Sequence, residues 1–304
     1  MKLKYHLSLL LANIAFGANY SFTDALVESP LGVNGLYFLR TITLFLIFTP
    51  LMFVKGESKI EIKDIWRILI ITLLLVVGRM YLLLYGIKHT TPIDGSIINT
   101  LSPVAMIITT SLLFHKHINR HTIVGAILAL FGAIVLIMNS EKSGGNSQII
   151  AGHNIGNIAI FTAMILSVFN TIWVKGLYFK YSRNTILGWA YFLGILFVIP
   201  LFLNDFVSVN FHQITSKEWL QLAIYLLFGT ISATFLLYYS LSGLSATTTS
   251  IYIYIQPVVA TLMAVVVQQD KLSLTTIISS ILIFVGVGVI LYKKRNCNYR
   301  RRCS

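Results

Sequence analysis

The sequence predicts an all-α integral membrane protein with ten transmembrane helices, arranged as two inverted five-helix repeats. Three observations predict this fold: a very apolar composition, ten apolar stretches of spanning length, and a long internal repeat. Hydrophobic residues make up 56% of the 304 residues and charged residues only 11%, whereas a soluble domain carries roughly 25% charged residues. The chain therefore has too few charged side chains to cover a surface in water.

The internal repeat emerges when the sequence is compared with itself at a shift of 154 positions, which places Pro103 on Pro257. The stretch around Pro103 then matches the stretch around Pro257 without a gap. The matched pairs include Tyr85 with Tyr239, Ser96 with Ser250, Ile97 with Ile251, Val104 with Val258 and Gly132 with Gly286. Because the shift is about half the chain length, we interpret the whole sequence as a tandem duplication.

Each half is expected to hold five transmembrane helices, since about 20 mainly apolar residues are needed to cross a bilayer. The stretches that meet this length are 5–27, 32–54, 65–87, 93–114, 119–139, 154–178, 184–203, 217–241, 246–268 and 273–292. A Gly- and Ser-rich insertion, Ser140–Gln148, separates the halves and favours a linker. We predict a first repeat at 1–140, an extracytoplasmic linker at 141–153, a second repeat at 154–292 and a basic cytoplasmic tail at 293–304.

Lysine and arginine are distributed unevenly between the two sides of the predicted bundle. With the N-terminus in the cytoplasm, the inward segments hold 17 of the 23 lysines and arginines, and the outward loops hold four. The positive-inside rule then favours cytoplasmic N- and C-termini. We expect a multi-pass protein of a bacterial-type inner (plasma) membrane. The net charge of +13 is therefore interpreted as a topology signal rather than as a nucleic-acid surface.

An odd number of helices per repeat forces the second repeat to enter the membrane from the opposite side. The halves would then be related by a pseudo-two-fold axis in the membrane plane, an arrangement found in secondary transporters. Such transporters bind their substrate near the midplane, between the halves. The sequence therefore favours a permease with a central cavity.

Four short motifs stand at characteristic places in the chain. They are Ser102-Pro103-Val104, Gln256-Pro257-Val258, Ala15-Phe16-Gly17-Ala18-Asn19 and Asp270-Lys271-Leu272-Ser273. Together they resemble the drug/metabolite transporter superfamily, in particular its EamA-type permeases with ten helices. Phe16 replaces the family's tryptophan, and Lys116 stands where the family usually has glutamate. The resemblance covers essentially the whole chain. It implies export, but it does not indicate one substrate, because the family is similar to exporters of amino acids, metabolites, nucleotide sugars and drugs.

Pro103 and Pro257 each fall near the middle of a predicted spanning helix. Because proline has no N–H, the carbonyl groups of Asn99 and Ile253 are expected to lose their helical donor. An unpaired carbonyl in hydrocarbon costs several kcal/mol, so it is tolerated only inside protein or beside water. We expect two helix kinks that border the cavity; kinks that only serve helix packing are the alternative.

Helical spacing places polar side chains along shared helix faces, which must point inward when lipid lies outside. The candidate substrate-binding residues are Asn13, Tyr20, Arg40, Arg79, Tyr81, Asn99, Ser102, Asn170, Trp173, Tyr238, Tyr252 and Gln256. For a serine or threonine on such a face, a hydrogen bond between helices is an equally good interpretation. For the deeper aromatic residues, packing is the alternative to lining a pocket.

Arg40 and Arg79 are the two basic residues that fall inside predicted helices, about 10 Å from the outer end at ~1.5 Å per residue. An arginine at membrane depth is costly and is by default a functional-site hypothesis. Its guanidinium presents a bidentate fork to a carboxylate or phosphate. The hypothesis is that one or both bind an anionic group of the substrate. Snorkelling, or pairing with Asp24, Glu28 or Asp94, is the alternative.

The chain shows no motif for cofactor or metal chemistry. A phosphate-binding glycine loop is missing, no serine–histidine–acid arrangement stands out, and His115, His117 and His121 lack metal-site spacing. No Asp or Glu lies at mid-membrane depth, although Asp24 and Asp94 near the outer surface could carry protons. We expect no cofactor, no metal and no enzymatic activity.

The predicted function is a secondary transporter that exports a small polar metabolite, such as an amino acid, by alternating access. An uptake or exchange carrier for an organic anion or a drug-like compound is the first alternative. A non-transporting scaffold or a channel is the alternative from a different class. The expected partners are a small-molecule substrate and the lipid bilayer.

Overall fold

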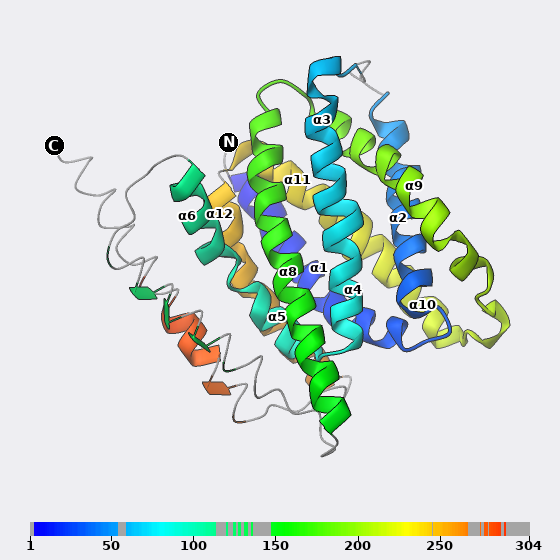
Figure 1. The fold of residues 1–304 in the computed structure, drawn as a ribbon, viewed down its shortest axis with the longest axis vertical. Coiled ribbons are helices and arrows are strands. Elements are labelled where there is room, and N and C mark those ends of the chain that lie inside the picture. Colours follow the sequence, from blue (N-terminus) through cyan, green and yellow to red (C-terminus); the bar gives the residue numbers. More distant parts are fainter. Residues whose placement is uncertain are drawn as a thin grey trace.

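The computed structural model describes residues 3–53, 59–113, 147–244 and 246–266, together with short stretches between 120 and 135 and between 274 and 289. In these residues the fold is a bundle of helices without strands (Figure 1). Expectations for the Asp270-Lys271-Leu272-Ser273 motif, the three histidines at 115–121 and the basic tail lie outside the described residues.

The first half begins with two long helices, α1 (Leu3–Val27) and α2 (Gly32–Leu51). A continuous third helix follows, made of α3 (Ile62–Ile71), the π-helical segment η1 (Thr72–Met80) and α4 (Tyr81–Lys88). The fourth is divided into α5 (Pro92–Asn99) and α6 (Ser102–Leu113).

The second half repeats this order with α8 (Ser147–Leu177) and α9 (Arg183–Val207). After the short η2 (Phe211–Gln213), a continuous helix joins α10 (Ser216–Ile224), η3 (Tyr225–Ser232) and α11 (Ala233–Gly243). The last described helix is divided into α12 (Ala246–Ile251), η4 (Tyr252–Tyr254) and α13 (Ile255–Val266).

Six helices of the described chain are long and apolar enough to cross a membrane. They are Gly32–Leu51, Ile62–Lys88, Pro92–Leu113, Asn154–Leu177, Arg183–Val207 and Ser216–Gly243. All six coincide with predicted spans, and the all-α fold is confirmed. The stretches 119–139 and 273–292 lie largely outside the described residues, so the number ten stays a prediction. Helix α8 begins seven residues before the predicted position 154, inside the predicted linker, because extending an existing helix costs little compared with starting one.

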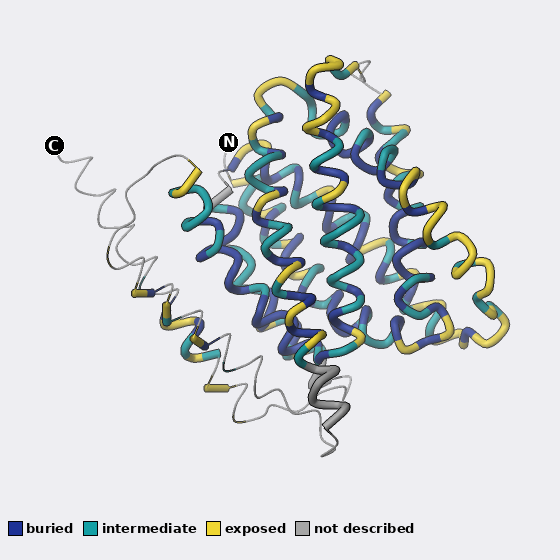
Figure 2. The backbone as a smooth tube through the Cα atoms, in the orientation of Figure 1, coloured by how far each residue is buried: buried dark blue, intermediate teal, exposed yellow. Residues whose placement is uncertain are grey.

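The outer face of the bundle carries large apolar side chains, which suits a lipid environment. Leu46, Leu201 and Phe228 are each at least 60% exposed, and Figure 2 shows buried residues gathered along the inward sides of the helices. The core holds Tyr37, Phe48, Tyr191 and other side chains from α2, α9 and the third helix of each half. The interior is therefore packed where the two halves meet.

At both prolines the regular α-helix is interrupted just before the proline. Helix α5 ends at Asn99 and Pro103 lies in the first turn of α6. In the second half, a 3₁₀ segment precedes α13, whose first turn holds Pro257. Proline is tolerated in the first turn of a helix, where its missing N–H has no helical partner in any case. Each proline therefore follows a local interruption of the α-helix, and a kink of the helix axis at these places stays a prediction.

The third helix of each half has a π-helical segment at nearly the same place in the repeat, η1 and η3. Shifted by 154 positions, η1 would cover 226–234, within two residues of η3. A π-helical turn widens the helix and displaces backbone hydrogen bonds. In η1 the carbonyl of Val76 accepts a hydrogen bond from the Tyr37 hydroxyl at 2.9 Å. The repeat therefore extends from the sequence to irregularities of the backbone.

Helices α2 and α9 occupy equivalent places in the repeat and pack against each other in opposite directions. Asn34, near the start of α2, donates to Asp205, near the end of α9, at 2.7 Å. Thr49, near the end of α2, donates to the Gly188 carbonyl near the start of α9 at 3.4 Å. Similarly, α1 packs on α11 and α13, while its equivalent α8 packs on α4 and α6. Exchanging the two halves thus reproduces the same set of neighbours.

Candidate central cavity

A cavity lies where the broken helices meet α1, α8 and the third helix of each half. It has two adjoining compartments, of about 60 Å³ and about 30 Å³. Phe16, Arg79, Asn99 and Gln256 line both of them. Because one water occupies roughly 10–15 Å³ on this scale, the two compartments have room for a few water molecules.

A chain of side-chain amides crosses the cavity wall between the halves. The Gln256 amide nitrogen donates to Asn13 at 2.8 Å, and Asn99 donates to Gln256 at 2.8 Å. Ser102 donates to the Asn99 carbonyl at 2.7 Å, which satisfies the backbone oxygen freed at the break. The three amides therefore bind one another while they border the cavity. The backbone carbonyl of Asn99, which has no helical donor because of Pro103, is satisfied by the Ser102 hydroxyl.

Both intramembrane arginines line this cavity. Arg79 borders both compartments and Arg40 borders the smaller one. Arg40 is 3% exposed, donates to the Tyr225 hydroxyl at 2.9 Å and lies 5.5 Å from the centre of that ring. No described carboxylate lies within ion-pairing distance of either guanidinium. Arg40 thus neither snorkels to the surface nor forms an ion pair with a described residue.

Tyrosine hydroxyls and amides surround the two guanidinium groups. Tyr20 lines the smaller compartment, and Tyr20, Tyr191 and Tyr238 lie near enough to Arg79 to interact with it electrostatically. Asn170 donates to the Tyr238 hydroxyl at 3.2 Å. The surroundings of the arginines are therefore polar but contain no acidic lining residue in the described chain.

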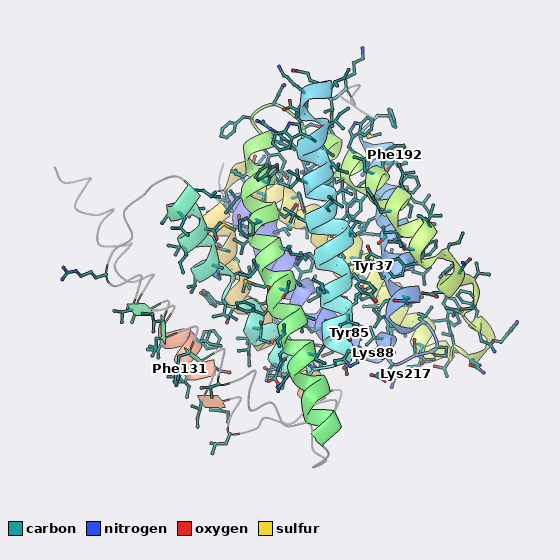
Figure 3. All side chains as sticks on the ribbon, in the orientation of Figure 1. Tyr37, Tyr85, Lys88, Phe131, Phe192 and Lys217 are labelled. Atoms are coloured by element: carbon teal, nitrogen blue, oxygen red, sulfur yellow. The ribbon has the colours of Figure 1, made fainter. Side chains whose placement is uncertain are left out.

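At one end of the bundle, a wide bowl of about 590 Å³ is lined by Asn34, Tyr81, Tyr85, Lys88 and Asp205, among others. Figure 3 places Tyr85 and Lys88 at this end, with Tyr37 deeper in the bundle. The rings of Tyr37, Tyr81 and Phe202 form a cluster, with centroids 5.0–5.5 Å apart. Together with the Asn34–Asp205 hydrogen bond, this cluster joins the halves beside the bowl.

The opposite end is also closed by contacts between the halves. The rings of Tyr5 and Tyr239 lie 5.0 Å apart, and the His6 ring accepts from or donates to the Tyr252 hydroxyl at 2.8 Å. Lys180 binds Glu61 and Asp64, each at 2.6 Å. The hydrogen bond to Asp64 raises the pKa of Lys180, and the hydrogen bond from Lys180 lowers the pKa of Glu61. Both ends of the cavity are thus bridged in this conformation.

The structure brings together seven of the twelve predicted site residues. Those that line one or both compartments are Asn13, Tyr20, Arg40, Arg79, Asn99, Ser102 and Gln256. The other five do not line them. Tyr81 lines the bowl, the Trp173 ring lies with its centre 6.0 Å from that of Trp66, and the Tyr252 hydroxyl forms a hydrogen bond with His6. Asn170 and Tyr238 are buried against each other, near Arg79. The role of all twelve in substrate binding stays a prediction.

Several lining residues were not among the candidates, notably Thr171, Ile253 and Asn19. Thr171 lies one helical turn after Ser167, which also lines the cavity, so extending that polar face would have found it. Ile253 gives no polar signal in the sequence. The described residues contain no cluster of histidine, cysteine and acidic side chains that could hold a metal ion.

Comparison with known proteins agrees with this architecture. A model of the EamA-like transporter family matches residues 3–138 and again residues 154–292. The chain belongs to the EamA-like transporter family.

The similar proteins found align with most of the chain. A protein of Bacillus subtilis named "Uncharacterized transporter YetK" is 26% identical over 265 residues, covering 86% of this chain and 78% of that protein. An "Uncharacterized transporter" of Archaeoglobus fulgidus is 24% identical and covers 97% of this chain and 99% of its own. A solved crystal structure, 14% identical, superposes with a TM-score of 0.63 over 95% of this chain and 97% of that one. This last likeness concerns the fold.

Proposed function

We propose that this protein is a secondary transporter that moves a small polar metabolite by alternating access around the central cavity. One observation supports the proposal above the others: residues at equivalent positions of the two halves line the same cavity. Asn13 and Ser167 form one such pair, and Ser102 and Gln256 form another. Equivalent residues meet in this way where a pseudo-two-fold axis passes through the cavity.

The opposite directions of α2 and α9 support an inverted repeat, with the axis in the membrane plane. In inverted-repeat transporters, the two halves rock around a site near the midplane. The two ends of this cavity are held by separate contacts between the halves, Asn34–Asp205 at one end and Glu61–Lys180 at the other. Rocking would break one set while keeping the other, which exposes the cavity to one side at a time.

The size of the cavity agrees with such a cycle. Two compartments of about 60 Å³ and about 30 Å³ hold a few waters, whereas small-molecule sites usually measure roughly 300–1,000 Å³. A bound substrate therefore requires the halves to separate. We propose that this conformation is an occluded one and that the working site forms when either end opens.

Following the positive-inside rule and the family resemblance, we propose a bacterial-type inner membrane location, cytoplasmic termini and export of an amino acid or related metabolite. Uptake or exchange of an organic anion is the second candidate, favoured by the two arginines in the cavity.

The test is flux from proteoliposomes loaded with a defined mixture of amino acids and organic acids, quantified by mass spectrometry. A carrier shows saturable flux that is accelerated by the same compound on the other side; a channel shows neither property, and a scaffold shows no flux. Absence of saturable flux for every compound contradicts the proposal.

Cross-links between the halves test the mechanism in the same assay. In a background with Cys297→Ser and Cys303→Ser, the pair Asn34→Cys with Asp205→Cys locks one end, and Glu61→Cys with Lys180→Cys locks the other. Each short thiol cross-link is expected to stop flux, and its removal to restore flux. Glu61→Cys with Lys63→Cys is the matched control, because Lys63 and Glu61 lie 2.6 Å apart within one half.

A further inference from the structure

The two guanidinium groups in the cavity have no negative partner in the described chain. Arg40 and Arg79 line the same compartment, and neither compartment is lined by an acidic residue among those the structure describes. The ion pairs that Glu61 and Asp64 form with Lys63, Arg67 and Lys180 lie at one end of the bundle, away from the two guanidinium groups. The cavity therefore concentrates two positive charges at membrane depth.

Such an arrangement is costly in the absence of a counter-charge. A charge taken out of water is stabilised only when it is paired and hydrogen-bonded, and two like charges in a low-dielectric interior repel each other. Arg40 and Arg79 are near enough to interact electrostatically. A protein that only needed a packed interior would not require this pair, since apolar side chains would fill the same volume at lower cost.

Hydrogen-bond donors without acceptors lie in the same region. The Nε of Arg40, a side chain 3% exposed, has no hydrogen-bond partner. The hydroxyl of Tyr191, a residue 0% exposed, also has none, and Tyr191 interacts electrostatically with both arginines. Buried donors of this kind are rare and call for an acceptor. Arg40, which borders the smaller compartment, thus combines a positive charge with a donor that is free for an acceptor on a ligand.

We infer that the substrate of this transporter carries a carboxylate or phosphate-type anion, which is seated between Arg40 and Arg79 in the smaller compartment. The larger compartment then receives the remainder of the molecule, between apolar side chains such as Phe16, Val168 and Leu237 and the amides of Asn13, Asn99 and Gln256. This inference rests on the proposed function and narrows its substrate class.

The same geometry disfavours a positively charged group on the substrate. An ammonium group is usually held by a carboxylate, and the described lining residues of both compartments provide none. Arg79 borders the larger compartment as well, where it repels a second positive charge. A net-negative organic anion, the second candidate of the proposed function, therefore fits better than a zwitterionic amino acid, the first candidate.

The experiment uses the full-length protein in nanodiscs of zwitterionic lipid, so that anionic lipid headgroups are not a competing source of the anion. Thermal stability is measured against butyrate, butyramide, 2-aminobutyrate and propylphosphonate, since a ligand that binds only the folded state raises its stability. Butyrate and butyramide differ in charge at nearly constant shape. Propylphosphonate separates a phosphate-type preference from a carboxylate preference.

Butyrate or propylphosphonate is expected to raise the unfolding temperature, and butyramide to leave it unchanged. Arg79→Gln is expected to weaken anion binding roughly tenfold or more, because a charge-assisted hydrogen bond is lost. Arg79→Lys, which keeps the charge and loses the fork, is expected to lie between Arg79→Gln and the natural protein. Arg67→Gln is the matched control, because Arg67 lies outside the cavity with a side chain 47% exposed, and it should bind like the natural protein.

The stability of the ligand-free variant separates a binding role from a structural one. Removing an unpaired charge from the cavity is expected to raise the unfolding temperature of ligand-free Arg79→Gln, whereas the loss of a structural arginine lowers it or prevents folding. The inference is overturned if Arg79→Gln is less stable without ligand, if it binds butyrate like the natural protein, or if butyramide or 2-aminobutyrate binds as well as butyrate.

The outcomes distinguish this inference from the proposed function. Anion binding that depends on Arg79, without saturable flux, overturns the transporter and keeps the anion site. Saturable flux of uncharged or zwitterionic compounds that is unaffected by Arg79→Gln keeps the transporter and overturns the anion site.

Discussion

The two halves of the molecule share a backbone plan but differ in the chemistry they bring to the cavity. Both have a third helix with a π-helical segment and a fourth helix that is broken at the same place in the repeat. The arginines, however, come from the first half alone. The positions equivalent to Arg40 and Arg79, 154 residues later, are Gly194 and Ala233.

Packing explains part of this difference. A Cβ atom at Gly194 would approach the Cγ1 of Val76 to 2.7 Å, and Ala233 is fully buried. Neither position has room for a guanidinium. In the first half, Arg40 instead finds the hydroxyl of Tyr225, whose equivalent is the apolar Ile71. The comparison teaches that the two repeats share a backbone plan, while each half contributes different side chains to one asymmetric cavity.

The largest loss of stability is expected from adding a side chain at Gly194, the position equivalent to Arg40, where a Cβ would lie 2.7 Å from Val76. Gly194→Ala should destabilise the protein by about 1–3 kcal/mol through overpacking against Val76. Gly176→Ala is the matched control, since a Cβ there meets no atom within 4 Å, and it should stabilise its helix by up to ~1 kcal/mol. Chemical denaturation in one detergent compares them; equal stability of both variants would contradict the packing explanation.

Gln256 is the second half's main polar contribution to the cavity wall. Gln256→Leu leaves both Asn13 and Asn99 without their partner across the interface. Since a buried polar group left unsatisfied costs about 1–3 kcal/mol, a loss of that size is expected in the free energy of unfolding. Gln213→Leu is the control, because Gln213 is an exposed glutamine beside the bowl. It should change the free energy of unfolding by less than about 0.5 kcal/mol. Two indistinguishable variants would mean that water replaces the amide chain.

The hydrogen bond from Arg40 to Tyr225 joins two residues whose equivalents, Gly194 and Ile71, cannot form one. Tyr225→Phe keeps the ring and removes the hydroxyl acceptor of the 2.9 Å hydrogen bond. A hydrogen bond to a charged group contributes about 1.5–3 kcal/mol, but the cation–π contact with the ring remains, so a loss near the lower limit is expected. Tyr239→Phe, whose ring packs on Tyr5 at the end of the bundle, is the control. Unchanged stability in Tyr225→Phe would show that Arg40 is held by other groups.

The smallest effect is expected at the exposed charge cluster that joins the halves. Because Lys180 lowers the pKa of Glu61, ionised Glu61 stabilises the fold above its ordinary pKa of about 4.3, and this contribution is lost as the pH falls through the lowered value. Glu61→Gln should therefore unfold at a slightly lower temperature than the natural protein at pH 7. The difference should vanish in acid.

Glu28→Gln serves as the control for that pH series, because Glu28 is exposed and forms no ion pair with a described residue. A difference between Glu61→Gln and the natural protein that persists unchanged in acid would exclude the charge pair as its cause.

The sequence predicted the six spans found in the described residues, but only part of the cavity lining. Membrane thickness imposes a minimum length on each apolar stretch, so span lengths follow from composition without knowledge of packing. Which face of a helix borders the cavity depends on its rotation. An α-helical period would place Tyr252 on the same face as Gln256, four residues later. Tyr252 lies instead in the 3₁₀ segment η4, where about three residues make a turn. That change of period turns Tyr252 away to His6.

By itself, the sequence determined an all-helical membrane protein built from a duplicated unit, because hydrophobic length and repeated residues are properties of the chain alone. Tertiary structure alone decided that the helices at Pro103 and Pro257 break, that equivalent residues of the two halves face one cavity, and that Arg40 and Arg79 share a compartment. The walls of this cavity depend on contacts such as Asn99–Gln256 and Arg40–Tyr225, which join residues 157 and 185 positions apart. Local spacing cannot specify such contacts, since each requires the partner half to be in place.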